Sequence, residues 1–163
     1  METFFGVRFL KNEYVIKNGR MDSIGIDENN CPVIFEYKRS SNENVINQGL
    51  FYLDWLFDHK ADFKILVIDK LGMEAAEKID WSVPCVICVA NDFTKYDLHA
   101  VNQMQRNIKL VRYKKYGKDL ILFEHLNAPT VTASVTAEQE AGEKKAGGVK
   151  THLEKLQSAP QYL

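Results

Sequence analysis

Asp22, Glu36 and Lys38 are the residues whose types and spacing best suit chemistry. A β-strand alternates its faces with a period of two, so Ile34, Glu36 and Lys38 share one face of a strand predicted over residues 33–39. Asp22 likewise shares its parity with apolar residues of the preceding predicted strand. Charged side chains are almost never buried in such strands unless they are paired or bound to a metal. If the two strands form a hairpin, both carboxylates and the ammonium group lie side by side.

This set of groups predicts a divalent-cation site. Mg²⁺ is usually held by one or two carboxylates together with waters and substrate phosphate. We therefore expect Asp22, Glu36 and the backbone carbonyl of Tyr37 to bind Mg²⁺, for which Mn²⁺ can substitute. A bound cation lowers the pKa of a coordinated water and offsets charge on a phosphate, while Lys38 would orient that water. The chemistry indicated is phosphodiester hydrolysis.

A purely structural interpretation of the same residues stays open. Asp22, Glu36 and Lys38 would then form an internal ion-pair network, although such networks stabilise proteins only weakly. The spacing Glu-x-Lys is uninformative by itself, because the chain contains a second example at 143–145. The context of the first example, in adjacent apolar strands, is what favours a site.

The spacing of apolar residues along the chain predicts the strands and helices that must position these residues. Asn18-Gly19 is typical of a hairpin turn. Residues 62–71 fit either a strand or a helix, and their spacing favours the helix. We expect strands at 9–16, 21–28, 33–39, 83–90, 109–116 and 119–125, and helices at 44–58, 62–71 and from an N-cap at Thr94 to residue 106. This order predicts a mixed α/β fold.

Composition limits the class of protein. The 163 residues carry 21 basic and 22 acidic side chains, so the net charge of −1 argues against a dedicated nucleic-acid scaffold but not against an enzyme. No apolar run is long enough to cross a membrane, so no membrane partner is expected. Without a secretory signal the expected location is cytoplasmic. Cys85 and Cys88 lie three apart in a predicted strand, which points them to opposite faces and predicts core cysteines rather than a zinc site.

The chain is predicted to divide at residue 127. Seventeen of its 18 aromatic residues lie between Phe4 and Phe123. Residues 128–149, rich in Ala, Thr, Gly and Glu, are predicted to form a flexible linker. Residues 150–163 resume a helical pattern and are expected to open a further C-terminal domain or tail.

Three motifs in order carry a resemblance to a known family. They are Gly19-Arg20-Met21-Asp22, Glu36-Tyr37-Lys38 and Gln48-Gly49-Leu50-Phe51-Tyr52. Together they resemble the restriction-endonuclease-like PD-(D/E)xK nucleases, and among these the nuclease domain of NucS-type DNA endonucleases. The similarity covers most of residues 5–126. Relatives usually begin with a helix carrying another acidic residue, for which Glu2 is the candidate here.

The resemblance implies a fold, an activity and residue roles. The fold is a mixed central sheet flanked by helices, and the activity is metal-dependent hydrolysis of DNA. Asp22 and Glu36 would be the metal ligands, Lys38 the catalytic lysine and Gln48 the residue on the phosphate side. Gln48 and Tyr52 are four apart on one helix face. Their alternative, purely structural roles are a buried amide bonded to backbone for Gln48 and a core side chain for Tyr52.

DNA contacts are expected from a basic run. Between residues 106 and 118 six positive charges occur with no acid among them, although a solvated hairpin explains them equally well. Arg112 and Lys114 point the same way on a strand, so both face DNA or both miss it. The residues expected to contact nucleic acid are Arg20, Tyr52, Arg106, Lys109, Arg112 and Lys114.

The alternative function is a catalytically weak or inactive nuclease-fold module for nucleic-acid binding or protein interaction. A module of that kind would not need Asp22, Glu36 and Lys38 together. A homodimer and a further domain of the same full-length protein are the other expected partners.

Overall fold

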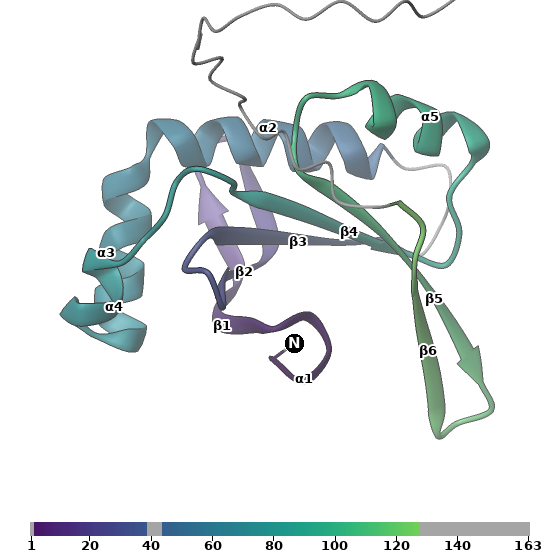
Figure 1. The fold of residues 1–163 in the computed structure, drawn as a ribbon, viewed down its shortest axis with the longest axis horizontal. Helices are drawn as coiled ribbons and strands as arrows, with labels where there is room; N and C mark the ends of the chain where they lie inside the picture. The colour runs from purple at the N-terminus through teal and green to yellow at the C-terminus, as the bar shows by residue number, and fades with distance from the viewer. Residues whose placement is uncertain (1, 39–43, 128–163) are drawn as a thin grey trace, which may run out of the picture. The chain divides into compact units, whose positions relative to one another are not determined.

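The computed structural model describes residues 2–38 and 44–127, which form a six-stranded sheet with helices (Figure 1). The strands lie in the order in which they occur along the chain. The elements are α1 (Glu2–Phe5), β1 (Val7–Ile16), β2 (Gly19–Asp27), β3 (Pro32–Lys38), α2 (Val45–Asp58), α3 (Lys60–Leu71), α4 (Met73–Glu77), β4 (Cys85–Ala90), α5 (Lys95–Gln103), β5 (Ile108–Tyr116) and β6 (Leu120–His125).

The sheet is mixed, as the sequence predicts. Strands β3, β4 and β5 are parallel neighbours, whereas β1–β2, β2–β3 and β5–β6 are antiparallel pairs. Parallel neighbours need crossover connections, which here contain α2 to α4 and then α5. The carboxyl ends of the three parallel strands therefore meet at one edge, where Lys38, Ala90 and Arg112 form a row across the sheet.

Each face of the sheet has its own apolar cluster. Helix α2 packs against β3 and β4, and α2 and α5 lie on the same side of the sheet (Figure 1). On this face Ile34, Val86 and Leu110 pack in one core with residues of α2. On the other face Phe35 and Ile87 belong to a smaller cluster, against which Phe5 of α1 packs.

The cysteine prediction is confirmed. Cys88 belongs to the cluster on the helix side and Cys85 to the cluster on the opposite side. Both thiols are free and buried, and burial raises the pKa of Cys85 to about 12. Cys31 is also free and buried. These side chains are core residues.

Several element boundaries differ from the predicted ones. Residues 62–71 are helical, within α3, whose C-cap is Gly72 with a φ of 88° that favours glycine. Thr94 begins α5 through a capping box with Asp97, but the helix ends at Gln103 rather than at residue 106. The short helices α1 and α4 were not predicted, because four or five residues carry too little periodicity.

Two further expectations concern the C-terminal segments and membrane-spanning helices. The predicted linker at 128–149 and the predicted opening of another domain at 150–163 lie outside the described residues. Within residues 2–38 and 44–127, no helix has the length and apolar character needed to cross a membrane.

The close approach of α2 to β4 depends on Gly49. A Cβ at this position would lie 2.5 Å from Cγ1 of Val86 and 3.8 Å from Sγ of Cys88. Atoms essentially never approach that closely, so any larger residue would push the helix away from the sheet. Since Cys88 is the register partner of Glu36, this contact also supports the strand that carries the candidate site.

We predict that Gly49→Ala destabilises the protein by about 1–3 kcal/mol, because overpacking outweighs the better helix propensity of alanine. The free energy of unfolding in urea measures the effect. Asn47→Ala, at an exposed position of the same helix, is the matched control and should not be destabilising. Equal stability of Gly49→Ala and the wild type would show that the helix does not need this close contact.

Candidate active site

Asp22 and Glu36 lie side by side because β2 and β3 pair as an antiparallel hairpin. The regular ladder ends at the pair Ser23–Phe35. Beyond it, the backbone N–H of Asp22 donates to Oε1 of Glu36 at 3.3 Å. The backbone N–H of Tyr37 in turn donates to Oδ2 of Asp22 at 2.8 Å. Each carboxylate is thus held by the backbone of the strand opposite its own.

Glu36 is the most unusual group in this arrangement. Its side chain is 0% exposed, and among the described residues its Oε2 atom has no hydrogen-bond partner. Burial, followed by the neighbouring charge of Asp22, raises the pKa of Glu36 to about 7, against the opposing effects of the Asp22 N–H and Lys38. A buried carboxylate with a free oxygen is costly unless a proton or a cation neutralises it.

Lys38 ends β3 two residues after Glu36, on the same face of the strand. It is close enough for its charge to lower the pKa of Glu36. The backbone N–H of Tyr37, between them, is occupied by Asp22. The structure therefore brings Asp22, Glu36 and Lys38 together at the carboxyl end of β3, and the role of the Tyr37 carbonyl as a third ligand stays a prediction.

The donor set suits a hard cation. Residues 2–38 and 44–127 contain no group of three or more His, Cys, Asp or Glu side chains that could hold a metal. The pair of Asp22 and Glu36 therefore offers only oxygen atoms from two carboxylates. Magnesium uses such a set, completed by waters and substrate phosphate, whereas zinc prefers nitrogen and sulfur ligands. The free Oε2 of Glu36 fits an oxygen-ligated ion.

Helix α2 is tied to the start of β2 through Tyr52. The hydroxyl of Tyr52 accepts hydrogen bonds from Nε2 of Gln48 at 3.1 Å and from the backbone N–H of Arg20 at 3.2 Å. A Cβ on Gly19 would lie 2.9 Å from that hydroxyl, so glycine allows the contact. Gln48 is accordingly held by a side chain rather than by backbone, and Tyr52 links it to Arg20, which lies two residues before Asp22 in β2.

The expectation that Tyr52 contacts nucleic acid needs correction. Tyr52 is only 3% exposed and belongs to the main core, where its hydroxyl already accepts two hydrogen bonds. The helical spacing correctly paired it with Gln48, but spacing does not report depth. The role of Gln48 on the phosphate side stays a prediction.

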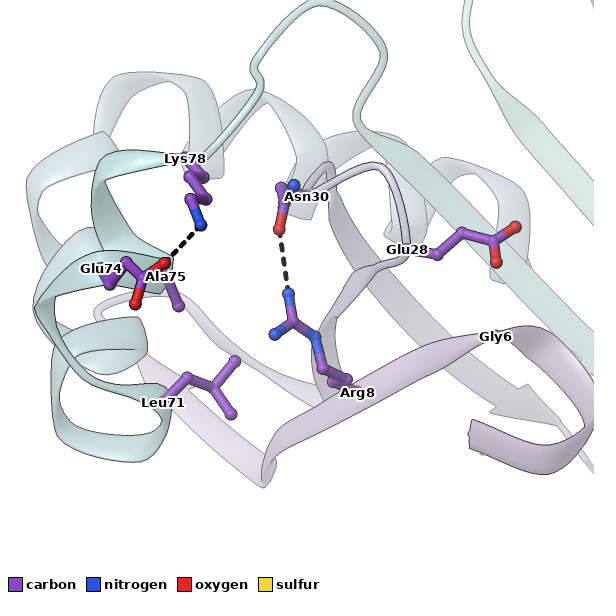
Figure 2. Close-up of a pocket in the computed structure, with 8 residues that line it drawn as sticks. All are labelled: Gly6, Arg8, Glu28, Asn30, Leu71, Glu74, Ala75 and Lys78. Carbon is purple, nitrogen blue, oxygen red and sulfur yellow. Dashed lines mark hydrogen bonds and ion pairs between the residues drawn. The ribbon is translucent and has the colours of Figure 1, made fainter.

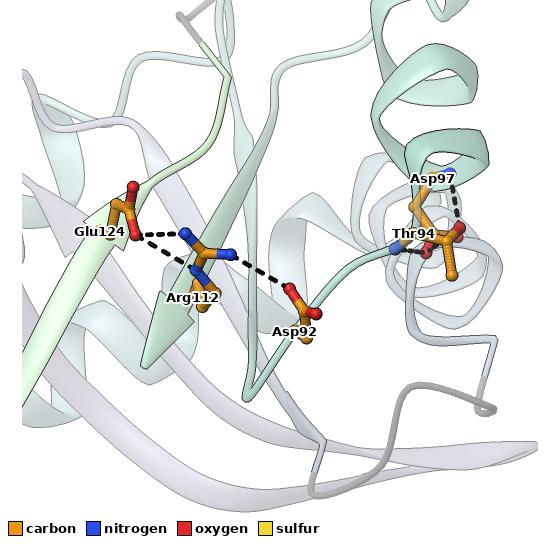
Figure 3. Close-up of polar contacts among 5 residues, drawn as sticks. All are labelled: Asp92, Thr94, Asp97, Arg112 and Glu124. Carbon is orange, nitrogen blue, oxygen red and sulfur yellow. Dashed lines mark hydrogen bonds and ion pairs between the residues drawn. The ribbon is translucent and has the colours of Figure 1, made fainter. Parts of the chain in front are cut away.

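The basic run is less free than its sequence indicates. Arg112 contacts Glu124 at 2.7 Å and Asp92 at 3.3 Å, linking β6 to the loop after β4 near the Thr94–Asp97 cap (Figure 3). Arg106 forms an ion pair with Asp54 at 3.3 Å. Acids from other elements therefore neutralise two of the six charges, and contact of Arg112 and Arg106 with nucleic acid stays a prediction.

The remaining basic residues divide between the faces of the sheet. Lys114 shares the face of Arg112 and lies beyond β4, where β5 pairs only with β6. Lys109 pairs with Ile87, whose cluster lies on the opposite face, so Lys109 lies on the other side of the sheet from Arg112 and Lys114. Arg20 forms an exposed ion pair with Glu13 at 3.0 Å.

Sequence reasoning missed the partners of Arg112, although one signal pointed to one of them. The turn at Gly117 sets the register of the β5–β6 hairpin, in which Tyr116 pairs with Leu120 and Arg112 with Glu124. Counting outward from the turn would have found Glu124. No comparable signal in the sequence places Asp92 beside β5.

Comparisons with known proteins give limited further information. No protein-family model matches the chain. It is 32% identical over 141 residues to an uncharacterised protein of Haemophilus influenzae, covering 83% of this chain and 47% of that protein. The chain thus spans about half the length of this curated relative.

Two solved structures show a low similarity. One is a complex of EndoMS with dsDNA, with a TM-score of 0.43 and 19% identity over 68% of this chain and 38% of that chain. The other is a repair endonuclease from Pyrococcus abyssi, with a TM-score of 0.42 and 18% identity over 66% of this chain and 39% of that chain.

The raised pKa of Glu36 predicts a specific pH dependence of stability. Between the ordinary value of 4.5 and about 7 the folded state holds a proton that the unfolded state releases, so the free energy of unfolding falls as pH rises through this window. Measured by urea unfolding, the wild type should lose on the order of 3 kcal/mol of unfolding free energy between these two pH values relative to Glu36→Gln. In Glu36→Gln this pH dependence should disappear. Glu77→Gln, an exposed control, should retain it. A parallel pH profile in Glu36→Gln and the wild type would contradict the assignment.

Proposed function

We propose that this protein is a divalent-metal-dependent nuclease that hydrolyses phosphodiester bonds of DNA. The observation that carries the proposal is the fully buried Glu36, with one free carboxylate oxygen, beside Asp22. A merely structural ion pair would satisfy both oxygens of a buried carboxylate. A pair of carboxylates that repel one another and leave an oxygen free is the arrangement that a bound cation stabilises.

The residues divide the work by their chemistry. Asp22 and Glu36 hold the cation, with the Tyr37 carbonyl as a third ligand. Bound Mg²⁺, or Mn²⁺ in its place, supplies charge neutralisation and a coordinated water of lowered pKa. Lys38, on the same strand face as Glu36, orients the attacking water and stabilises negative charge near the phosphate. Gln48, held by Tyr52, offers its amide to a phosphate oxygen.

The β5–β6 hairpin is the proposed DNA-binding element. The row Lys38–Ala90–Arg112 places β5 two strand spacings, about 10 Å, from β3 at the edge that holds the site. From this row the hairpin continues past β4, and Lys114 lies on the face it shares with Lys38. Arg112 holds the base of the hairpin through Asp92 and Glu124 and so orients Lys114.

Metal binding and turnover should respond differently to substitutions in the site. Isothermal titration calorimetry with Mg²⁺ and Mn²⁺ should detect no binding to Asp22→Ala or Glu36→Ala, because each variant removes one of two carboxylates. Lys38→Ala should bind metal but lose cleavage, because the lysine serves the water. Asp119→Ala, outside the site, is the matched control and should behave as wild type. Metal binding retained in both carboxylate variants would refute the site.

A cleavage screen tests the activity itself. Single-stranded, mismatched, branched and duplex DNA, together with RNA, are incubated with the wild type and with Asp22→Ala in Mg²⁺ or Mn²⁺. Metal-dependent cleavage that is lost in the variant supports the nuclease. Binding without cleavage of any substrate would instead assign the domain to the alternative class of nucleic-acid-binding or interaction modules.

The salt dependence of DNA binding tests the hairpin. Lys114→Gln should lower the slope of log K against log salt by up to about 0.9 on duplex DNA, the effect of one lost phosphate contact. Metal affinity should not change. Lys109→Gln, which removes the same charge from the opposite face, is the control and should keep the wild-type slope. An equal slope in all three proteins would show that Lys114 is a solvated surface residue that does not contact DNA.

The remaining proposed partners are a further domain of the same full-length protein and a second copy of this chain. Self-association into a homodimer is checked by analytical ultracentrifugation of the full chain.

A further inference from the structure

A cavity of about 570 Å³ lies at the opposite end of β3 from the carboxylates. It is an open cleft lined by the start of β1, the turn between β2 and β3, and the end of α3 with α4 (Figure 2). The lining residues are Gly6, Arg8, Glu28, Asn30, Leu71, Glu74, Ala75 and Lys78. Its volume is within the range of small-molecule sites, and the proposed nuclease activity does not use it.

The guanidinium of Arg8 lies within this cavity. Its side chain is half-buried, and Nη2 donates to Oδ1 of Asn30 at 3.0 Å. Among the described residues, Arg8 has no carboxylate within ion-pair distance, and that single bond is the only one its guanidinium forms. Most of its N–H donors are therefore left for solvent or for a ligand in the cavity.

Asn30 holds the guanidinium in place. It adopts a φ of 64°, which asparagine tolerates, and its N–H donates to the Asp27 carbonyl at 3.0 Å. Its own carbonyl accepts from the N–H of Asp80 at 2.9 Å, which ties the turn to the segment after α4. Arg8 is therefore aimed into the cavity by a fixed neighbour (Figure 2).

A second cation faces Arg8 across the cavity. Lys78, at the end of α4, is largely exposed at the rim of the cavity, and its Nζ contacts Glu74 at 2.6 Å (Figure 2). Glu28 also lines the cavity, but its carboxylate points away from both cations. The lining carries two cations and two acids, and because Lys78 is paired with Glu74 and Glu28 is turned away, Arg8 is the lining cation that has no acidic partner among the described residues. Leu71 and Ala75 add a small apolar wall.

We propose that this cavity binds a small organic oxyanion, a carboxylate or a phosphate ester, between Arg8 and Lys78. The planar guanidinium binds two oxygen atoms of the group, a geometry that arginine favours for both carboxylates and phosphates. Lys78 contributes a point charge, and the body of the ligand rests on Leu71 and Ala75. Because the site is separate from Asp22 and Glu36, its test is independent of the proposed nuclease function.

Nuclear magnetic resonance titrations of the full chain test the proposal, with inorganic phosphate and acetate as the probes. Saturable shifts are expected for the amides of Gly6, Asn30 and Ala75 and for the Arg8 Nε–H. Tighter binding of phosphate would assign the ligand to phosphate esters, and tighter binding of acetate to carboxylates. No saturable shift with either anion at millimolar concentration would overturn the proposal.

Variants separate this site from general charge effects. Arg8→Gln should weaken binding by about tenfold or more, the loss of a charge-assisted hydrogen-bonded pair. Arg8→Lys should restore it only in part, because the fork is lost, and Lys78→Gln should weaken it several-fold. Lys70→Gln removes an equal charge beside Leu71 but outside the lining, so it should bind as wild type. Equal weakening in Lys70→Gln and Lys78→Gln would refute the site.

Discussion

Glu36 is a fully buried carboxylate beside a second carboxylate, and this electrostatic constraint organises the end of the sheet around it. The hairpin of β2 and β3 accommodates it by giving one oxygen of each carboxylate a backbone N–H from the opposite strand. The second oxygen of Glu36 receives nothing from the described residues. A fold that keeps such a group away from water while leaving it unsatisfied gives up stability at this point, which is characteristic of functional sites.

Close packing of α2 supports the strands that carry the site. Gly49 lets the helix approach β4 at the level of Val86 and Cys88, and Gly19 lets the ring of Tyr52 approach the start of β2. The Tyr52 hydroxyl then fixes both the amide of Gln48 and the backbone of Arg20. The helix is thus positioned by two glycines and one phenol, and the same contacts set where Gln48 stands relative to β2.

The two ends of the central strands carry opposite chemistry. The carboxyl ends of β3, β4 and β5 place Lys38 and Arg112 in one row across the sheet, with Lys38 near the buried Glu36. The turn before β3 instead forms one wall of a cavity with Arg8 and Lys78. Polar groups can concentrate at both ends because the middle of each parallel strand is buried on both faces and must be apolar.

The sequence by itself determined the mixed α/β class, the two central hairpins, the residues of the candidate site and the burial of the cysteines. Period-two alternation and turn chemistry act locally, so they can be read without the fold. Depth and long-range charge partners could not be read in this way. Tyr52 is in the core and Arg112 is neutralised by Asp92 and Glu124 because distant elements meet only when the sheet assembles. The free oxygen of Glu36 and the aim of Arg8 are likewise decided by tertiary packing, since hydrogen-bond satisfaction depends on every neighbour at once.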